Sequence, residues 1–100
     1  MIEEFTDLRP DEVELRGIWL RDGSRARADD VCRRIEWLVK FRLEHLGTDP
    51  SGWNKLYRDP RDGRLWELAY PESEMHGGGP PSLRLIAQPD AAAKYGVTPV

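Results

Sequence analysis

The sequence predicts an α+β domain in which an antiparallel sheet of about four strands packs against one long amphipathic helix. Three observations predict this class. They are a helical repeat of apolar residues from position 31 to 46, two alternating segments around a turn at 60–63, and turn residues between the other apolar runs. The expected order is strand, helix, strand, strand, strand and short helix. Because 100 residues can bury one core, residues 1–100 are expected to form a single domain.

The first strand is expected over residues 12–22. Val13 and Leu15 alternate loosely there, and Gly17 is compatible with a bulge. Asp22 and Gly23 then provide the turn that closes the strand.

The long helix is expected to begin at Asp29 or Asp30, whose carboxylates can cap its first turn, and to end at Leu46, where Gly47 provides a C-cap. At about 100° per residue, its apolar residues share an arc of about 140° that faces the sheet. They are Val31, Cys32, Ile35, Leu38, Val39, Leu43 and Leu46. A second row beside this arc holds Trp37, Phe41 and His45, and a charged row on the far side holds Glu36, Lys40 and Glu44.

Two cationic residues, Arg34 and Arg42, fall inside the apolar arc once the second row widens it. We expect their stems to lie along the core and their guanidinium groups to reach water, as long cationic side chains commonly do. The alternative is that each binds a carboxylate partner.

A β-hairpin is expected over residues 53–70, because two alternating segments flank Pro60 and Gly63, which suit a turn with a bulge. One face of this hairpin carries an aromatic ladder made by Trp53, Tyr57, Trp66, Leu68 and Tyr70. The opposite face carries Leu65, Glu67 and Ala69. A strand over 82–88 and a short helix over 90–95, ended by Gly96, complete the order.

Charge and composition exclude several classes of partner. The net charge of −3 divides into −5 over residues 1–14, +4 over 15–42 and −2 over 43–100. With a pI near 5.4, a surface that binds nucleic acid is not expected. No apolar run approaches the roughly 20 residues that span a bilayer, and the acidic N-terminus is unlike a signal peptide. We therefore expect a cytoplasmic protein with no membrane partner.

Candidates for catalysis or metal binding are few. Cys32 is the only cysteine, so neither a disulfide nor a zinc site is expected. We interpret Cys32 as a small core hydrophobe and His45 as a packed or half-exposed histidine. The histidine and three glycines at 76–79 are compatible in composition with an esterase oxyanion loop or a phosphate-binding loop. The chain has no nucleophile elbow to accompany the first, and no helix follows the glycines as the second requires. Three carboxylates, Glu67, Glu72 and Glu74, lie close enough in sequence for acid and base roles. We interpret them instead as a solvated acidic loop.

Residues 70–81 combine features of a binding loop. Pro71 stops strand pairing, the glycines allow unusual backbone shapes, and Pro80 with Pro81 stiffens the exit. The candidate partner-contact residues are Tyr70, Glu72, Glu74, Met75, His76, Gly77, Gly78 and Gly79. The alternative is that the glycines serve only a tight connection between strands.

Four stretches of the chain carry a family resemblance: ELRGIWL at 14–20, DDVCRRIEWL at 29–38, GWNKLYRDPRDGRLWELAYPESEMHGGGPPSL at 52–83, and KYG at 94–96. On these stretches the chain resembles the immunity protein 27 family of bacterial polymorphic toxin systems. The resemblance implies an α+β fold, no cofactor, and a role in protecting the producing cell by binding and blocking a cognate toxin.

The first hypothesis is therefore a binding protein without catalytic activity, whose partner is a cognate toxin. A second hypothesis is a small hydrolase-like enzyme that uses His76 with Glu72 or Glu74. The aromatic residues Trp37 and Phe41 leave a homodimer open in either case.

Overall fold

The computed structural model describes residues 5–22, 25–71 and 79–96 and has a five-stranded antiparallel sheet in the order β1-β7-β6-β5-β4. These strands are β1 (Glu14–Arg16), β4 (Glu44–Thr48), β5 (Lys55–Arg58), β6 (Leu65–Ala69) and β7 (Ser82–Ile86). The other elements are a ribbon of β2 (Trp19–Asp22) with β3 (Arg25–Ala28), helix α1 (Asp30–Trp37) with its π-helical continuation η1 (Leu38–Arg42), and helix α2 (Gln88–Tyr95). The predicted α+β class is confirmed, with five strands in the sheet where about four were expected.

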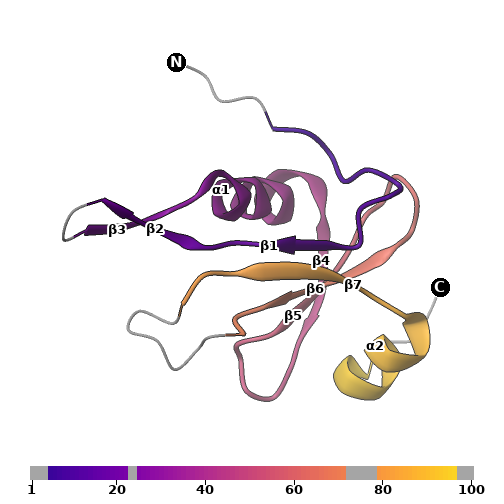
Figure 1. The fold of residues 1–100 in the computed structure, drawn as a ribbon. Helices are drawn as coiled ribbons and strands as arrows, with labels where there is room; N and C mark the ends of the chain where they lie inside the picture. Colours follow the sequence, from indigo (N-terminus) through magenta and orange to yellow (C-terminus); the bar gives the residue numbers. More distant parts are fainter. Residues whose placement is uncertain (1–4, 23–24, 72–78, 97–100) are drawn as a thin grey trace.

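The two helices cover opposite faces of the main sheet, and the β2–β3 ribbon extends away from it (Figure 1). Trp66 of β6 packs in a buried cluster with Ile35 and Leu38 of the first helix. Its neighbour Leu65 packs in a second cluster with Ala91 of α2. Adjacent residues of a strand point to opposite faces, so one strand serves both cores. Among the residues that the structure describes, no helix is long and apolar enough to cross a bilayer.

The predicted start of the long helix is confirmed, but its predicted end is wrong. Asp29 is the N-cap, and its carboxylate accepts a backbone N–H of the first turn at 2.8 Å. The helix ends at Arg42 rather than at Leu46. The Leu43 N–H donates to the Leu38 carbonyl at 2.8 Å, and the backbone of Leu43 is extended.

Residues 44–48 form the edge strand β4 because pairing with β5 satisfies their backbone groups, and this tertiary pairing overrides the helical pattern. Gly47 follows a register shift in this strand and does not cap the helix. His45, expected in the second helical row, contacts Tyr57 of β5 with 5.4 Å between the ring centroids. Leu46, expected in the buried arc, is 37% exposed.

The predicted first strand is in fact two strands, separated at Gly17. The Gly17 N–H donates to the Pro81 carbonyl at 2.9 Å, and a Cβ added at Gly17 would collide with the Cys32 sulfur. The chain passes so close to α1 here that it leaves the main sheet, and β2 pairs with β3 instead. Strand β3 was not expected from the sequence. Residues 23–24, which include part of the expected turn, lie outside the described residues.

The predicted hairpin and its aromatic ladder are confirmed. Tyr57 of β5 lies opposite Trp66 of β6, and the rings of Trp53 and Tyr70 meet edge to face with centroids 5.8 Å apart. Gly63 has a φ of 79°, which lets the chain turn back between the strands.

The predicted last strand and short helix are also confirmed, with shifted boundaries. The strand ends at Ile86, and α2 begins at Gln88 with Pro89 in its first turn. Gly96 ends the helix in the left-handed conformation, with a φ of 68°.

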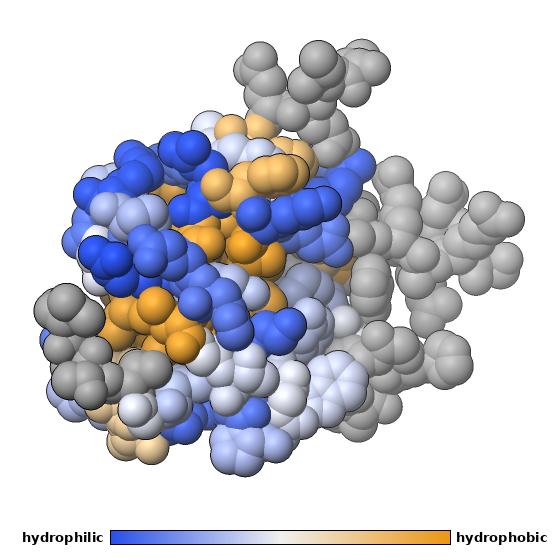
Figure 2. All heavy atoms as spheres, turned by 180° about the vertical axis from the view of Figure 1, so that it is seen from behind, coloured by the Kyte–Doolittle hydropathy of each residue, from blue (hydrophilic) through white to orange (hydrophobic). Residues whose placement is uncertain are grey.

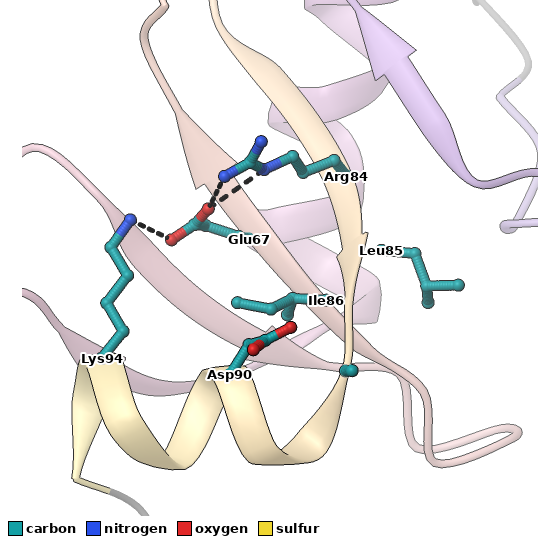
Figure 3. A pocket seen from close by; sticks show the side chains of 7 residues that line it. Glu67, Arg84, Leu85, Ile86, Asp90 and Lys94 are labelled. Atoms are coloured by element: carbon teal, nitrogen blue, oxygen red, sulfur yellow. Dashed lines mark hydrogen bonds and ion pairs between the residues drawn. The ribbon is translucent and has the colours of Figure 1, made fainter.

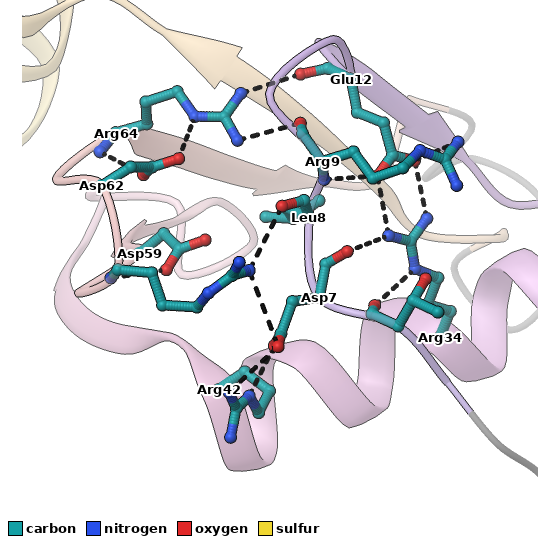
Figure 4. Close-up of polar contacts among 11 residues, drawn as sticks. Asp7, Leu8, Arg9, Glu12, Arg34, Arg42, Asp59, Asp62 and Arg64 are labelled. Carbon is teal, nitrogen blue, oxygen red and sulfur yellow. Dashed lines mark hydrogen bonds and ion pairs between the residues drawn. The ribbon is translucent and has the colours of Figure 1, made fainter.

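Residues 5–12 form no helix or strand, but arginines of the first helix bind them (Figure 4). Arg34 donates to both carboxylate oxygens of Glu12, at 2.7 and 2.8 Å, and to two backbone carbonyls of the segment. Arg42 donates to the carboxylate of Asp7 at 2.6 and 3.0 Å. The expectation that both guanidinium groups reach water is wrong for Arg34, whose side chain is only 15% exposed. Arg42 is exposed as expected, but the acidic N-terminal segment supplies a carboxylate partner to both arginines.

Two arginines at the hairpin turn bind the same segment (Figure 4). Arg64 donates to the carbonyls of Arg9 and Glu12, both at 3.1 Å, and Arg61 donates to the carbonyl of Leu8 at 3.4 Å. Leu8 is 2% exposed and belongs to the main buried cluster. The segment therefore covers part of the core, and its negative charge meets positive charge from both the helix and the hairpin.

Glu12 provides a test of this arrangement. Hydrogen bonds from Arg34, opposed by burial, lower the pKa of Glu12 from 4.5 to about 2. A carboxyl group with a lowered folded-state pKa stabilises the fold above its unfolded pKa, and this contribution is lost as pH falls through the folded value. We predict that Glu12→Gln lowers the free energy of unfolding at pH 7 by about 1–3 kcal/mol. The difference from the wild type should shrink as pH falls from 4.5 to about 2.

Urea denaturation followed by tryptophan fluorescence at several pH values measures this difference. Glu14→Gln is a matched control, since the Glu14 side chain is exposed and its carboxylate has no ion pair or hydrogen bond among the described residues. This substitution should change stability by less than about 0.5 kcal/mol. Equal stability of Glu12→Gln and the wild type at pH 7 would contradict the role assigned to Glu12.

Candidate functional site

The predicted partner-contact segment begins just after β6 and ends just before β7. Tyr70 follows β6, Gly79 lies three residues before β7, and both line the same pocket. The other predicted contact residues lie outside the described residues; they are Glu72, Glu74, Met75, His76, Gly77 and Gly78. The structure therefore places the two ends of the predicted site and brings them together.

This pocket, called here the Tyr70 pocket, has a volume of about 210 Å³. It is lined by Ile35, Glu36, Val39, Leu68, Tyr70, Gly79 and Pro81. Most of its wall is apolar, and its polar side chains are those of Glu36 and Tyr70. A concave apolar surface with a few polar groups is typical of binding sites in proteins.

The local structure explains why these residues meet. Ile35 and Val39 are four residues apart, so they lie on one side of the helix. Leu68 and Tyr70 are two residues apart along the strand direction and point to the face that the helix covers. Gly79 is buried with a φ of 72°, a conformation that favours glycine and lets the backbone form part of the wall.

The polar groups of the Tyr70 pocket are available for a partner. Burial, together with the charge of Glu36, raises the pKa of Tyr70, so its hydroxyl is protonated and can donate at neutral pH. Within the described part of the chain, neither this hydroxyl nor the Glu36 carboxylate has a hydrogen bond or an ion pair. Trp53, which packs against Tyr70, is 52% exposed and extends the aromatic surface beside the pocket.

Sequence reasoning missed Glu36 as a site residue. Helical rotation placed it in the charged row that faces water, and Ile35 and Val39 were assigned only to the core. Ile35 is near the centre of the apolar arc, and Glu36 is turned from it by about 100°, which places Glu36 just outside the border of the arc. No local signal could place it beside Tyr70, because that proximity depends on how the helix packs across the sheet.

A second pocket, called here the Glu67 pocket, has a volume of about 360 Å³ and lies between β6, β7 and α2 (Figure 3). Its lining is Glu67, Arg84, Leu85, Ile86, Ala87, Asp90 and Lys94. One carboxylate oxygen of the fully buried Glu67 accepts two hydrogen bonds from Arg84, at 2.9 and 3.1 Å. The other accepts the Tyr95 hydroxyl at 2.6 Å and pairs with the Lys94 ammonium group at 2.7 Å.

Glu67 has a structural role in this arrangement. Burial raises the pKa of Glu67, but the hydrogen bonds from Lys94, Tyr95 and Arg84 together lower it by more. The pKa therefore lies below its usual value. At neutral pH the carboxylate is ionised with both oxygens occupied, which leaves it unsuited to general acid or base catalysis. The interpretation of Glu67 as part of a solvated acidic loop is wrong, because it is buried and joins α2 to the sheet.

Cys32 and His45 show no arrangement for nucleophilic catalysis. Cys32 is 1% exposed, which confirms it as a core hydrophobe, and burial raises its pKa to about 11. A thiol with a raised pKa is a poor nucleophile at neutral pH. His45 is exposed, with its Nε2 atom 3.0 Å from the Thr48 hydroxyl. In the part of the chain that the structure describes, no three His, Cys, Asp or Glu side chains are grouped to hold a metal ion.

Comparison with known proteins identifies the family. A family model described as Immunity protein 27 matches residues 21–87. The chain belongs to the immunity protein 27 family. The matched range contains two of the four stretches that carry the resemblance, at 29–38 and 52–83, and it contains every residue of the Tyr70 pocket. No curated protein and no solved structure matches the chain.

In this member of the immunity protein 27 family, we expect the buried Glu67 carboxylate to stabilise the fold. Glu67→Gln keeps the shape of the side chain but leaves Arg84 and Lys94 without a buried anion. We expect the free energy of unfolding to fall by about 1.5–3 kcal/mol, the usual range for hydrogen bonds to charged groups. Urea denaturation at pH 7 measures this loss.

Glu44→Gln is the matched control, because Glu44 forms an exposed ion pair with Arg58 at 3.3 Å. Exposed pairs contribute at most about 1 kcal/mol and often much less. If Glu67→Gln cost no more stability than Glu44→Gln, the buried carboxylate would not be what attaches α2 to the sheet.

Proposed function

We propose that this protein binds and blocks a cognate bacterial toxin without catalysing a reaction, and so protects the cell that produces both. Membership of the immunity protein 27 family carries this proposal. The described residues support it, because they present an open pocket with unpaired polar groups beside an exposed aromatic side chain, Trp53. Interface anchors are commonly aromatic side chains next to pockets.

The proposed contact surface combines the Tyr70 pocket with the segment that connects its two ends. From that segment we propose Tyr70, Glu72, Glu74, Met75, His76, Gly77, Gly78 and Gly79 as toxin contacts. An interface of standard size buries about 800 Å² on each partner, so neighbouring residues such as Trp53 would be included. The producing cell's cytoplasm is the proposed location.

The exposed apolar side chains of this protein do not form one continuous face in the view of Figure 2, where apolar groups lie in patches among hydrophilic ones. Phe41 is 65% exposed, whereas Trp37 is partly buried and its ring lies 5.9 Å from that of Phe5. A homodimer through both residues would therefore rest mainly on Phe41. We propose a surface that meets the toxin through a pocket and a few anchors rather than through a broad apolar face.

The alternative function, a hydrolase-like enzyme, depends on His76 with Glu72 or Glu74, all of which lie outside the described residues. Within the described residues, Cys32 is buried with a raised pKa, and His45 lies 3.0 Å from the Thr48 hydroxyl with no carboxylate bonded to its ring, so the orienting third group of a catalytic triad is missing. No observation in the structure favours the alternative over binding.

Co-expression tests the proposal. The product of the gene immediately upstream is the candidate toxin, and we predict that it arrests growth alone and is neutralised when this protein is produced with it. Because a binding protein acts one for one, rescue should require at least equimolar protein, and an affinity tag on either chain should recover both.

The His76→Ala variant separates binding from catalysis. Full rescue by this variant would exclude an enzyme that depends on His76. Because His76 is also a proposed toxin contact, binding is measured in parallel: an enzyme would lose all protection while still co-purifying with the toxin, whereas a binding protein should lose protection only as far as it loses affinity. Rescue by far less than one equivalent of protein, or failure of the two chains to co-purify, would count against the proposal.

A further inference from the structure

The two pockets differ in their charge balance. In the Glu67 pocket, the cations of Arg84 and Lys94 are already bound to the buried carboxylate, and Asp90 adds a second acid to the lining. In the Tyr70 pocket, the only charged side chain is Glu36, and within the described residues nothing neutralises it. The Tyr70 pocket therefore has an unsatisfied negative charge that a bound group can pair with.

The size and lining of the Tyr70 pocket limit what that group can be. Its volume of about 210 Å³ lies below the roughly 300–1,000 Å³ of small-molecule sites, so it suits a single side chain of a protein partner. The apolar wall of Ile35, Val39 and Leu68 matches an aliphatic stem. Glu36 and the Tyr70 hydroxyl add a carboxylate and a polar group for the end of that side chain.

We propose that the Tyr70 pocket receives one basic side chain, a lysine or an arginine, from the toxin. Such a side chain has an aliphatic stem and a cationic end that would pair with Glu36. A purely apolar side chain would bury the Glu36 carboxylate without a partner, which is costly, and an acidic one would be repelled. This inference rests on the proposed function and adds the chemistry by which the toxin is recognised.

Three substitutions test the pocket. Glu36→Gln removes the charge and keeps the shape, and Tyr70→Phe removes only the hydroxyl. Glu14→Gln is the matched control, because the Glu14 side chain, like that of Glu36, is exposed and without a partner among the described residues. Glu14 is in register with Arg84 and Glu67, so it lies on the face of the sheet opposite the Tyr70 pocket. Circular dichroism and thermal unfolding would verify that all three variants remain folded.

Isothermal titration calorimetry with the purified upstream toxin measures the dissociation constant of each variant. We expect Glu36→Gln to weaken binding about 10- to 100-fold, the range of a hot-spot residue, and Tyr70→Phe to weaken it several-fold. Glu14→Gln should bind within about twofold of the wild type. In a double-mutant cycle, the loss caused by Glu36→Gln should disappear when one particular lysine or arginine of the toxin is already replaced by alanine.

The outcomes separate this inference from the proposed function. If the wild type does not bind the toxin, the proposed function fails and the inference fails with it. If the wild type binds but Glu36→Gln and Tyr70→Phe bind equally well, the function stands and the pocket is not the recognition site. Tighter binding by a Glu36→Leu variant, or the absence of coupling to any lysine or arginine, would also overturn the inference.

Discussion

The contact between Arg34 and Glu12 positions the elements on which the candidate site depends. One guanidinium group binds a carboxylate and two backbone carbonyls, and thereby fixes the N-terminal segment against the helix just before the segment enters β1. Removing an ion pair from water costs free energy, and this cost is offset only when the donors of the pair have good hydrogen-bond partners. In Arg34, the Nε, Nη1 and Nη2 atoms all donate to the N-terminal segment. Glu36 lies two residues farther along the same helix. Ile35 and Leu38 of this helix are buried in the core, so this packing and the Arg34 contact together fix the face of the helix from which Glu36 points.

The two faces of the main sheet use ionisable groups in opposite ways. On the α2 face, Glu67 is fully buried and its charge is balanced by Arg84 and Lys94, so these three charged groups are paired with one another. On the α1 face, the Tyr70 pocket retains Glu36 and a protonated tyrosine hydroxyl without internal partners among the described residues. A protein that must fold alone and then bind another chain needs both kinds of surface. We infer that α2 serves stability and that the α1 face serves recognition.

Features that depend on near neighbours in the sequence were predictable. Asp29 caps the helix and Gly63 turns the hairpin, since each acts on groups within a few residues. Features that depend on distant segments were not: residues 44–48 continue a helical pattern, yet they pair with β5, because backbone pairing in the sheet outweighs a weak local preference. The same limit applies to the site. The aromatic ladder predicted where Tyr70 lies, whereas the position of Glu36 beside it depends on the packing of the helix on the sheet.

We propose that this immunity protein 27 family member binds a toxin through the α1 face of its sheet. Hydrogen–deuterium exchange of the free and toxin-bound protein tests it most directly, because it reports every backbone amide without substitution. We expect slower exchange on binding in the helix around Glu36 and at the amides of Ala69, Tyr70 and Gly79, with little change in α2. Protection confined to α2 and the Glu67 pocket, or to the edge strand β4, with none around Glu36, would contradict it.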